Sequence, residues 1–324
     1  MKPDTIAMIR DCVPEIMPLT YYADRESAWC LANMMPAEDT VPALRKSRLG
    51  RFLDRPILKP LVASCGGTLR RADVRALAQA GDGLRMTGVT QGGYTALEGV
   101  FATAWDDYVL TLTKWGDTYR WPDAQTSLRG LNLVLQVGFP AAHAELLNRV
   151  GLKANRKQFE VSHHPIRTDG APTLSWARLE VDLESGEALI EEVQSDWLRR
   201  VRRHCDRESK RAPRSRALRV LQSYEADLTA RYGKLWPKVT LLAALLFLKE
   251  ELGCTRIWMH QPGPGVALKQ IKGPAPPVSL YSALPKSFGF TPTDEVPPFL
   301  KPARRKTLRD LRKRHDTLFW RMDL

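Results

Sequence analysis

Apolar residues along the chain follow two different periods, and each period predicts a different kind of element. Residues Trp176 to Leu183 alternate apolar and polar, Glu184 to Glu187 form a turn, and Ala188 to Val193 return as a second strand. A period of two is typical of a strand with one buried face, so residues 176–193 are predicted to form an antiparallel hairpin. An apolar-rich run, Asn132 to Phe139, is interpreted as a buried strand.

Beyond the hairpin the period changes to that of helices. Trp197, Leu198 and Val201 begin an amphipathic helix that Pro213 must interrupt or end, because proline has no backbone N–H for a helix interior. Further helical segments and a short strand, Thr255 to His260, follow. This order of elements predicts an α+β fold, a mostly antiparallel sheet with packed helices.

The same pattern divides the chain into three parts. Residues 1–130 are predicted to be an N-terminal α+β region, and residues 131–300 an α+β domain. Residues 301–324 are predicted to be a basic C-terminal helix with an apolar face at Leu308, Leu311, Leu318 and Phe319. Whether the first 130 residues fold independently is left open.

A second hairpin is expected in the N-terminal region. Val100 to Trp105 and Tyr108 to Trp115 have the composition of strands, and Asp106 and Asp107 lie between them. Two polar residues between two such runs are typical of a tight turn, so a hairpin is predicted here.

Composition narrows the class of protein without naming a function. With 44% hydrophobic and 26% charged residues, the 324-residue chain is an ordinary globular protein. The five cysteines are scattered and have no C-x-x-C spacing, which favours a reducing compartment. The sequence has no signal-peptide pattern and no apolar run of membrane-spanning length, so a cytoplasmic location without a membrane partner is predicted. The oligomeric state is left open.

Positive charge is concentrated in two segments. The chain has 49 Lys and Arg against 36 Asp and Glu, a net charge of +13. Residues 199–219 contain ten basic and two acidic residues, and residues 301–324 contain nine and three, so these segments carry +8 and +6 and the remainder about −1. Such a patch is typical of contact with phosphates, and nucleic acid is the natural polyanion; a merely solvated surface is the alternative. The candidate nucleic-acid-binding residues are Arg199, Arg200, Arg202, Arg203, Arg207, Lys210 and Arg211.

The seven residues 191–197, Glu-Glu-Val-Gln-Ser-Asp-Trp, lie where the second strand of the hairpin ends and the basic helix begins. A rigid strand positions polar groups there, and a helix start supplies unpaired N–H groups, so this is the best candidate site. A structural role is the alternative: Ser195 or Asp196 caps the helix and Trp197 anchors it. The adjacent His163 and His164 point to opposite faces if they lie on a strand, so no metal site is predicted.

The segment from Ser162-His163-His164 through Trp176-Ala177-Arg178 to Leu189–Trp197 resembles one found in uncharacterised bacterial proteins and in large polyvalent proteins of phages. Trp236, Gly253, Arg256-Ile-Trp and Leu280–Phe290 follow in the expected order. The likeness covers residues 160–290 and implies no established reaction. It supports His163, Arg178, Ser195 and Trp197 as substrate-binding candidates.

The C-terminal half also resembles, in its order of elements, the GCN5-related N-acetyltransferases. That likeness implies a carboxylate near the fourth strand as general base, here Glu191 or Glu192, and a Tyr before a Gly-Phe pair as general acid, here Tyr281. It implies acetyl-coenzyme A as cofactor. Residues 194–203 contain no glycine, unlike the cofactor loop of that family.

Three hypotheses therefore stand. The leading one is a protein that binds or acts on a phosphate-bearing partner, nucleic acid above all, in a cleft at the end of the 188–193 strand. The second is an acyltransferase, and the third is a non-catalytic interaction module. The candidate catalytic residues are Glu192, Gln194, Asp196 and Tyr281.

Overall fold

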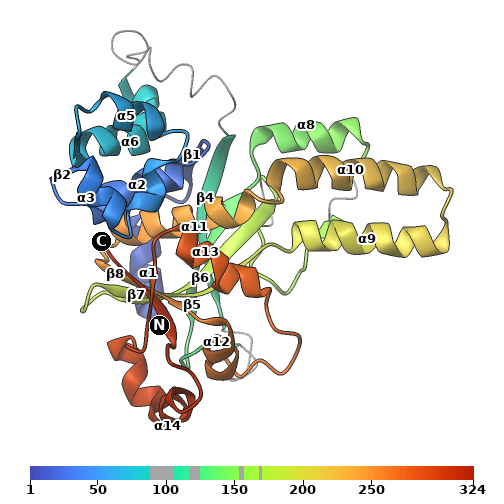
Figure 1. Ribbon diagram of the computed structural model, residues 1–324. Coiled ribbons are helices and arrows are strands. Elements are labelled where there is room, and N and C mark those ends of the chain that lie inside the picture. Colours follow the sequence, from blue (N-terminus) through green and yellow to red (C-terminus); the bar gives the residue numbers. More distant parts are fainter. Residues whose placement is uncertain (88–105, 117–124, 153–156, 168–169) are drawn as a thin grey trace.

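One eight-stranded sheet forms the centre of the molecule (Figure 1). The computed structural model describes residues 1–87, 106–116, 125–152, 157–167 and 170–324. The strands lie in the order β1-β4-β5-β6-β7-β8-β10-β9. Their bounds are β1 Met17–Tyr21, β4 Asp106–Trp115, β5 Asn132–Gly138, β6 Thr173–Asp182, β7 Glu187–Gln194, β8 Arg256–His260, β9 Thr291–Thr293 and β10 Phe319–Asp323.

A single pair of neighbouring strands in this sheet is parallel, β7 with β8, and the described neighbours are otherwise antiparallel. A parallel pair needs a long crossover, which residues 195–255 supply with three α-helices and a short π-helix. The pairing joins Glu187–Ile190 to Arg256–Met259 and then stops, although β7 continues to Gln194. The two strands therefore separate beyond Ile190.

A β-bulge lies at the point of separation. Arg178 on β6 pairs with Glu192 and Leu179 pairs with Ile190, so Glu191 is an extra residue in β7. Successive strand residues normally point to opposite faces, and one extra residue breaks that alternation. Glu191 and Glu192 consequently lie on the same face of the sheet.

Helices cover the opposite face, which is apolar. Helix α11 (Trp236–Leu246) packs across β5, β6 and β7, and α2 (Arg25–Met34) packs against α11 and α6 (Arg71–Thr87). Seven consecutive residues of α11 are buried, from Val239 to Leu245, which is why its sequence is apolar on all sides. This layer joins the N-terminal region to the rest of the core.

Two long helices form an arm that projects from the sheet (Figure 1). Helix α9 (Trp197–Arg211) and helix α10 (Arg216–Tyr232) lie side by side, and Pro213 stands in the link between them as expected. Trp197 anchors the base of the arm, because its indole N–H donates to the Tyr224 hydroxyl at 2.7 Å. The remaining elements are α1 Pro3–Cys12, β2 Glu38–Thr40, α3 Val41–Lys46, α4 Gly50–Leu53, α5 Lys59–Ser64, β3 Thr68–Arg70, α8 Ala141–Arg149, η2 Phe247–Glu251, α12 Pro262–Leu268, η3 Val278–Tyr281, α13 Ala283–Ser287, η4 Pro298–Leu300 and α14 Lys301–Arg312.

Two sequence predictions are corrected. Asp106 and Asp107 are not a turn: they belong to β4 and pair with Tyr21 and Thr20 on β1. The strand predicted before them, residues 100–105, lies outside the described residues. The C-terminal helix ends at Arg312, and Phe319–Asp323 is strand β10 within the sheet. Phe319 and Met322 are buried there, because each belongs to one of the two hydrophobic clusters that pack against the sheet.

The α+β class is confirmed, with a mostly antiparallel sheet and packed helices. The sheet is continuous across residue 130, because β1 and β4 of the N-terminal region extend the sheet of the following domain. Among the described residues no helix has both the length and the apolar character needed to span a membrane.

Candidate functional site

A cleft of about 790 Å³ opens at the C-terminal end of β7, between the base of the arm and the loop that precedes η3. We call it the strand-end cleft. The predicted site residues Glu192, Gln194 and Ser195 line it, together with three arginines of α9. The remaining lining residues are Gln125, His164, Val193, Leu198, Glu225, Thr229, Gly233, Trp236, Ile271, Gly273, Pro274, Ala275, Pro276, Pro277 and Leu280.

A hydrogen-bonded cluster surrounds Asp196 at the start of α9. Its Oδ2 lies 2.6 Å from Nδ1 of His164, and its Oδ1 accepts from the Gln194 side chain at 2.7 Å. Arg199 forms an ion pair with the same carboxylate. Burial would raise the pKa of Asp196, but the contacts with His164 and Arg199 lower it below its usual range. Asp196 is thus a fixed anion that orients His164 in the cleft wall.

A buried ion pair joins β6 to β7. Arg178, only 1% exposed, pairs with the Glu192 carboxylate and also donates to the backbone oxygen of Gln125 at 3.0 Å. Burial would raise the pKa of Glu192, and the Arg178 charge lowers it instead. Glu192 therefore reaches the cleft as a stable carboxylate.

Two side chains occupy the gap where β7 and β8 separate. Lys269 donates to the backbone oxygen of Glu191 at 3.0 Å, and the Tyr281 hydroxyl accepts from the Val193 N–H at 3.4 Å. These two backbone groups lie on the edge of β7 where pairing with β8 has ended. Burial, with the nearby Glu192 charge, raises the pKa of Tyr281 above its usual range, so its hydroxyl keeps its proton.

A second buried cluster lies around Glu191. Its carboxylate accepts from the backbone N–H of Ser127 at 3.0 Å and lies 3.0 Å from Nε2 of His260. The Ser127 hydroxyl is 2.9 Å from the same His260 nitrogen. In a catalytic triad the serine and the carboxylate bind opposite ring nitrogens. Here both bind Nε2, so Ser127 is not an activated nucleophile.

The basic residues of α9 divide into two groups. Arg199, Arg202 and Arg203 line the strand-end cleft. Arg207, Lys210 and Arg211 are exposed farther along the arm, and Arg200 is half-buried on it. Of the second charged segment, Arg304 is buried and hydrogen-bonds the backbone oxygens of Ser127 and Thr126.

The remaining candidates from the sequence are spread around this cleft. Tyr281 is 3% exposed and does not line the cleft, although its neighbour Leu280 does. His163 is exposed and meets His164 edge to face, and His164 is the histidine that contacts Asp196. Trp197 is 1% exposed in the aromatic core at the base of the arm, so it anchors α9 and does not line the cleft.

Sequence reasoning missed His260 and Lys269. Both are buried polar residues, His260 at the end of β8 and Lys269 directly after α12, and nothing in their spacing connects them with Glu191, 69 and 78 positions earlier. The one signal in the sequence was a charged residue, Lys269, among apolar neighbours. A lysine is rarely buried unless it is paired, so such a residue marks a candidate site.

No group of three or more His, Cys, Asp or Glu suited to a metal ion occurs in the part of the chain that the structure describes. Comparison of the chain with protein-family models, with curated proteins and with solved structures gives no match. The function is therefore argued from the site alone.

Proposed function

We propose that the chain is an acyltransferase that binds a coenzyme A thioester in the strand-end cleft. The observation that carries this proposal is the separation of β7 from β8, the one parallel pair of the described sheet, beside the arginine-lined cleft. The resemblance to GCN5-related N-acetyltransferases agrees with this arrangement. The link to the bacterial and phage segments stays a prediction.

The arginines supply the site for the phosphates. Arg199, Arg202 and Arg203 are spaced three and four residues apart, so they lie on one face of α9 and turn toward the cleft. Guanidinium groups match phosphate geometry well. The Asp196 carboxylate occupies the start of α9 and repels an anion there. Phosphates are thus expected on the arginine side chains, which removes the need for a glycine-rich loop.

The reacting carbonyl belongs at the border of the cleft. When an acyl group is bound, its carbonyl oxygen would replace the Tyr281 hydroxyl as the acceptor for the Val193 N–H, which then stabilises the developing oxyanion. Tyr281, protonated at neutral pH, would donate its proton to the departing thiolate. Arg178 holds Glu192 as an anion and lowers its pKa, so Glu192 is a weak base and is not the residue that removes a proton from the acyl acceptor.

Calorimetry with acetyl-coenzyme A tests the proposal. We expect binding to the wild-type chain, and about tenfold weaker binding for the double variant Arg202→Gln/Arg203→Gln, because two charge-assisted phosphate contacts are lost. Arg207→Gln is the matched control, since Arg207 is exposed on the same helix and does not line the cleft. Absence of heat with the wild-type chain at millimolar ligand would exclude the acyltransferase.

Nucleic-acid binding is a second candidate, favoured by the outer half of the arm. Arg207, Lys210, Arg211, Arg214 and Arg216 are exposed there, beyond the cleft. Retention on a DNA column should fall steeply between low and moderate salt, because phosphate contacts release counterions. The two candidates separate cleanly: Arg207→Gln/Lys210→Gln should weaken DNA retention and leave acetyl-coenzyme A binding unchanged. Elution that does not change with salt would remove this candidate.

A further inference from the structure

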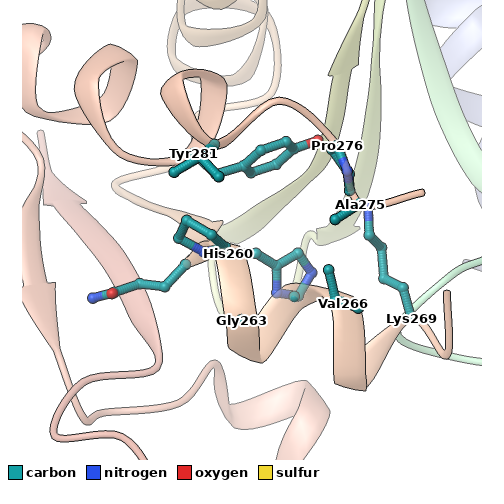
Figure 2. A pocket seen from close by; sticks show the side chains of 11 residues that line it. His260, Gly263, Val266, Lys269, Ala275, Pro276 and Tyr281 are labelled. Atoms are coloured by element: carbon teal, nitrogen blue, oxygen red, sulfur yellow. The ribbon is translucent and has the colours of Figure 1, made fainter.

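A second, smaller pocket of about 260 Å³ adjoins the strand-end cleft, and Figure 2 shows the side chains that line it. We call it the apolar pocket. The rings of Tyr281 and His260 and the side chain of Lys269 surround it, and Ala275 and Pro276 line both this pocket and the cleft. The other lining residues are Gln261, Pro262, Gly263, Gly265, Val266 and Val278.

One ring nitrogen in the wall of the apolar pocket has no hydrogen-bond partner among the described residues. His260 is 0% exposed, and its Nδ1 is buried and unpartnered. Glu191 is a carboxylate that can only accept, so Nε2 of His260 carries the proton in the 3.0 Å contact between them. In the neutral ring Nδ1 is then a lone-pair acceptor, and a buried acceptor without a donor is costly.

Glycine allows this ring to lie against α12. A Cβ added at Gly265 would be 2.7 Å from Cβ of His260 and 3.7 Å from Nδ1, so the Nδ1 edge of the ring faces Gly265, which also lines the pocket. Any larger residue would displace the ring. The pocket and the orientation of the imidazole therefore depend on the same glycine.

The charges around the pocket select what can enter it. Lys269 is 2% exposed, and its Nζ lies 5.6 Å from the centroid of the Tyr281 ring. No Asp or Glu of the described residues lines the pocket. A protonated amine would meet this ammonium group directly, because the Glu191 and Glu192 carboxylates near Lys269 do not line the pocket, whereas a neutral hydroxyl group would meet the open Nδ1 of His260.

We propose that the apolar pocket binds a small apolar alcohol whose hydroxyl group donates to Nδ1 of His260, and that this alcohol is the acyl acceptor. The binding part stands on the pocket alone, and the acceptor role rests on the proposed acyltransferase function. His260 is then the catalytic base, and Glu191 is a positioning residue that fixes its tautomer.

The proposed step balances as an ester synthesis. The hydroxyl oxygen attacks the thioester carbonyl carbon while its proton passes to Nδ1 of His260. The carbon–sulfur bond then breaks, and the thiolate takes the proton of the Tyr281 hydroxyl. The proton on His260 restores Tyr281, directly or through the departing product. One ester and one free coenzyme A thiol are formed, and no oxidant or metal is required.

Imidazole ¹⁵N NMR on the full chain, titrated with benzyl alcohol, tests the binding. We expect the His260 Nδ1 resonance to move as it accepts a hydrogen bond, and toluene to bind about fivefold more weakly without moving it, as the loss of one hydrogen bond implies. The resonance is assigned from its loss in His260→Gln. If that variant does not fold, the resonance is assigned from its contacts to Phe319. The Phe319 ring centroid lies 5.3 Å from that of His260.

Two glycine variants provide the matched pair. Gly265→Ala should abolish the Nδ1 shift, because the new methyl group displaces the ring. Gly273→Ala is the control for the NMR shift alone, since a Cβ there meets no atom within 4 Å and Gly273 does not line the apolar pocket. If benzyl alcohol leaves the His260 resonance in place, or binds no better than toluene, the proposal is overturned.

A coupled assay separates this inference from the proposed function. With acetyl-coenzyme A and benzyl alcohol, thiol release should depend on the alcohol and fall at least a hundredfold in His260→Gln, the usual contribution of a general base. Benzylamine in place of the alcohol should release little thiol. If acetyl-coenzyme A binds but the alcohol does not promote thiol release, the acceptor role fails alone. If acetyl-coenzyme A does not bind, the proposed function fails and the NMR result still decides the pocket.

Discussion

The two faces of the sheet at β6 and β7 differ in chemistry although the same strands supply both. On the helix-covered face, Ala177, Leu179, Ile190 and Val193 are all buried in one hydrophobic cluster with α11. On the opposite face the buried side chains include Arg178, Glu191 and Glu192. The first face gains stability from apolar burial, whereas the second holds charges that are tolerated only because each one has a partner.

This difference separates stability from chemistry. The helix-covered face tolerates exchange of one apolar residue for another of similar volume, because the hydrophobic effect has no direction. The charged face depends on particular atoms at particular distances, and the strand-end cleft and the apolar pocket both adjoin it. Variants on the two faces should therefore fail in different ways.

The largest effect is expected for Arg178→Met. The substitution leaves the Glu192 carboxylate buried without its cation, which should lower the free energy of unfolding by about 3–5 kcal/mol. Urea denaturation measures it. Replacing both partners, as Arg178→Met/Glu192→Leu, should recover much of the loss, because an apolar pair leaves no buried charge. A double variant no more stable than the single one would show that the face needs the ions themselves.

Next comes Leu179→Ala on the helix-covered face. A fully buried leucine leaves a cavity, so the free energy of unfolding should fall by about 3 kcal/mol. Acetyl-coenzyme A binding by the folded variant should not change, because Leu179 does not line the cleft. Calorimetry at a temperature where the variant is folded checks this. Weaker binding would mean that the two faces are coupled.

Tyr281→Phe should act on the reaction and leave stability nearly unchanged. Loss of the general acid is expected to lower kcat about a hundredfold with little change in KM. The ring and its contact with Lys269 remain and only the long 3.4 Å hydrogen bond from the Val193 N–H is lost, so the free energy of unfolding should fall by about 1 kcal/mol. Steady-state kinetics and urea denaturation together make the test. A change in stability without a change in kcat would make Tyr281 a structural residue.

The most gradual effect is the acid dependence of stability caused by Glu191, which reaches about 3 kcal/mol only over the whole range from pH 4.5 to pH 2. Burial would raise its pKa, but the hydrogen bond and charge interaction with His260, with Lys269 and Arg178 nearby, lower it to about 2. A lowered carboxyl pKa stabilises the fold above the ordinary value of 4.5, and this stability is lost as the pH falls from 4.5 toward 2. The slope is at most about 1.4 kcal/mol per pH unit.

Denaturation curves between pH 5 and pH 2 (about the range that this linkage affects) compare the wild-type chain with Glu191→Gln, whose curve should be flatter. Glu184→Gln is the control, because Glu184 is exposed in the turn of the same hairpin. Equal slopes in wild type and Glu191→Gln would remove the linkage.

Sequence periodicity predicted the elements whose apolar residues recur at the spacing of a strand or of a helix. The hairpin of β6 and β7, the buried strand β5 and the arm helices all follow from apolar spacing. It failed at the C-terminus, because Leu308, Leu311, Leu318 and Phe319 fit one helical stripe, although Leu318 precedes strand β10 and Phe319 begins it. The candidate site was found in part, because Glu192, Gln194 and Ser195 lie together in the chain and in the cleft.

The rest of the site could not be read from the sequence for physical reasons. His260 and Lys269 meet Glu191 only because β8 lies parallel to β7, and a parallel register is set by tertiary packing. The choice of His164 over His163 depends on which of two adjacent side chains faces the sheet. Neither contact has a local signature.

The bulge at Glu191 makes the chemistry of this region depend on chain length as well as on residue type. β7 has one residue more than β6 over the same paired stretch. Deletion of Glu191 would restore regular alternation and leave every neighbouring residue identical in type. It would also remove the partner of His260 and allow β7 to follow β8 farther. A shortened chain of this kind would have a more regular sheet and would lack the opening between the strands.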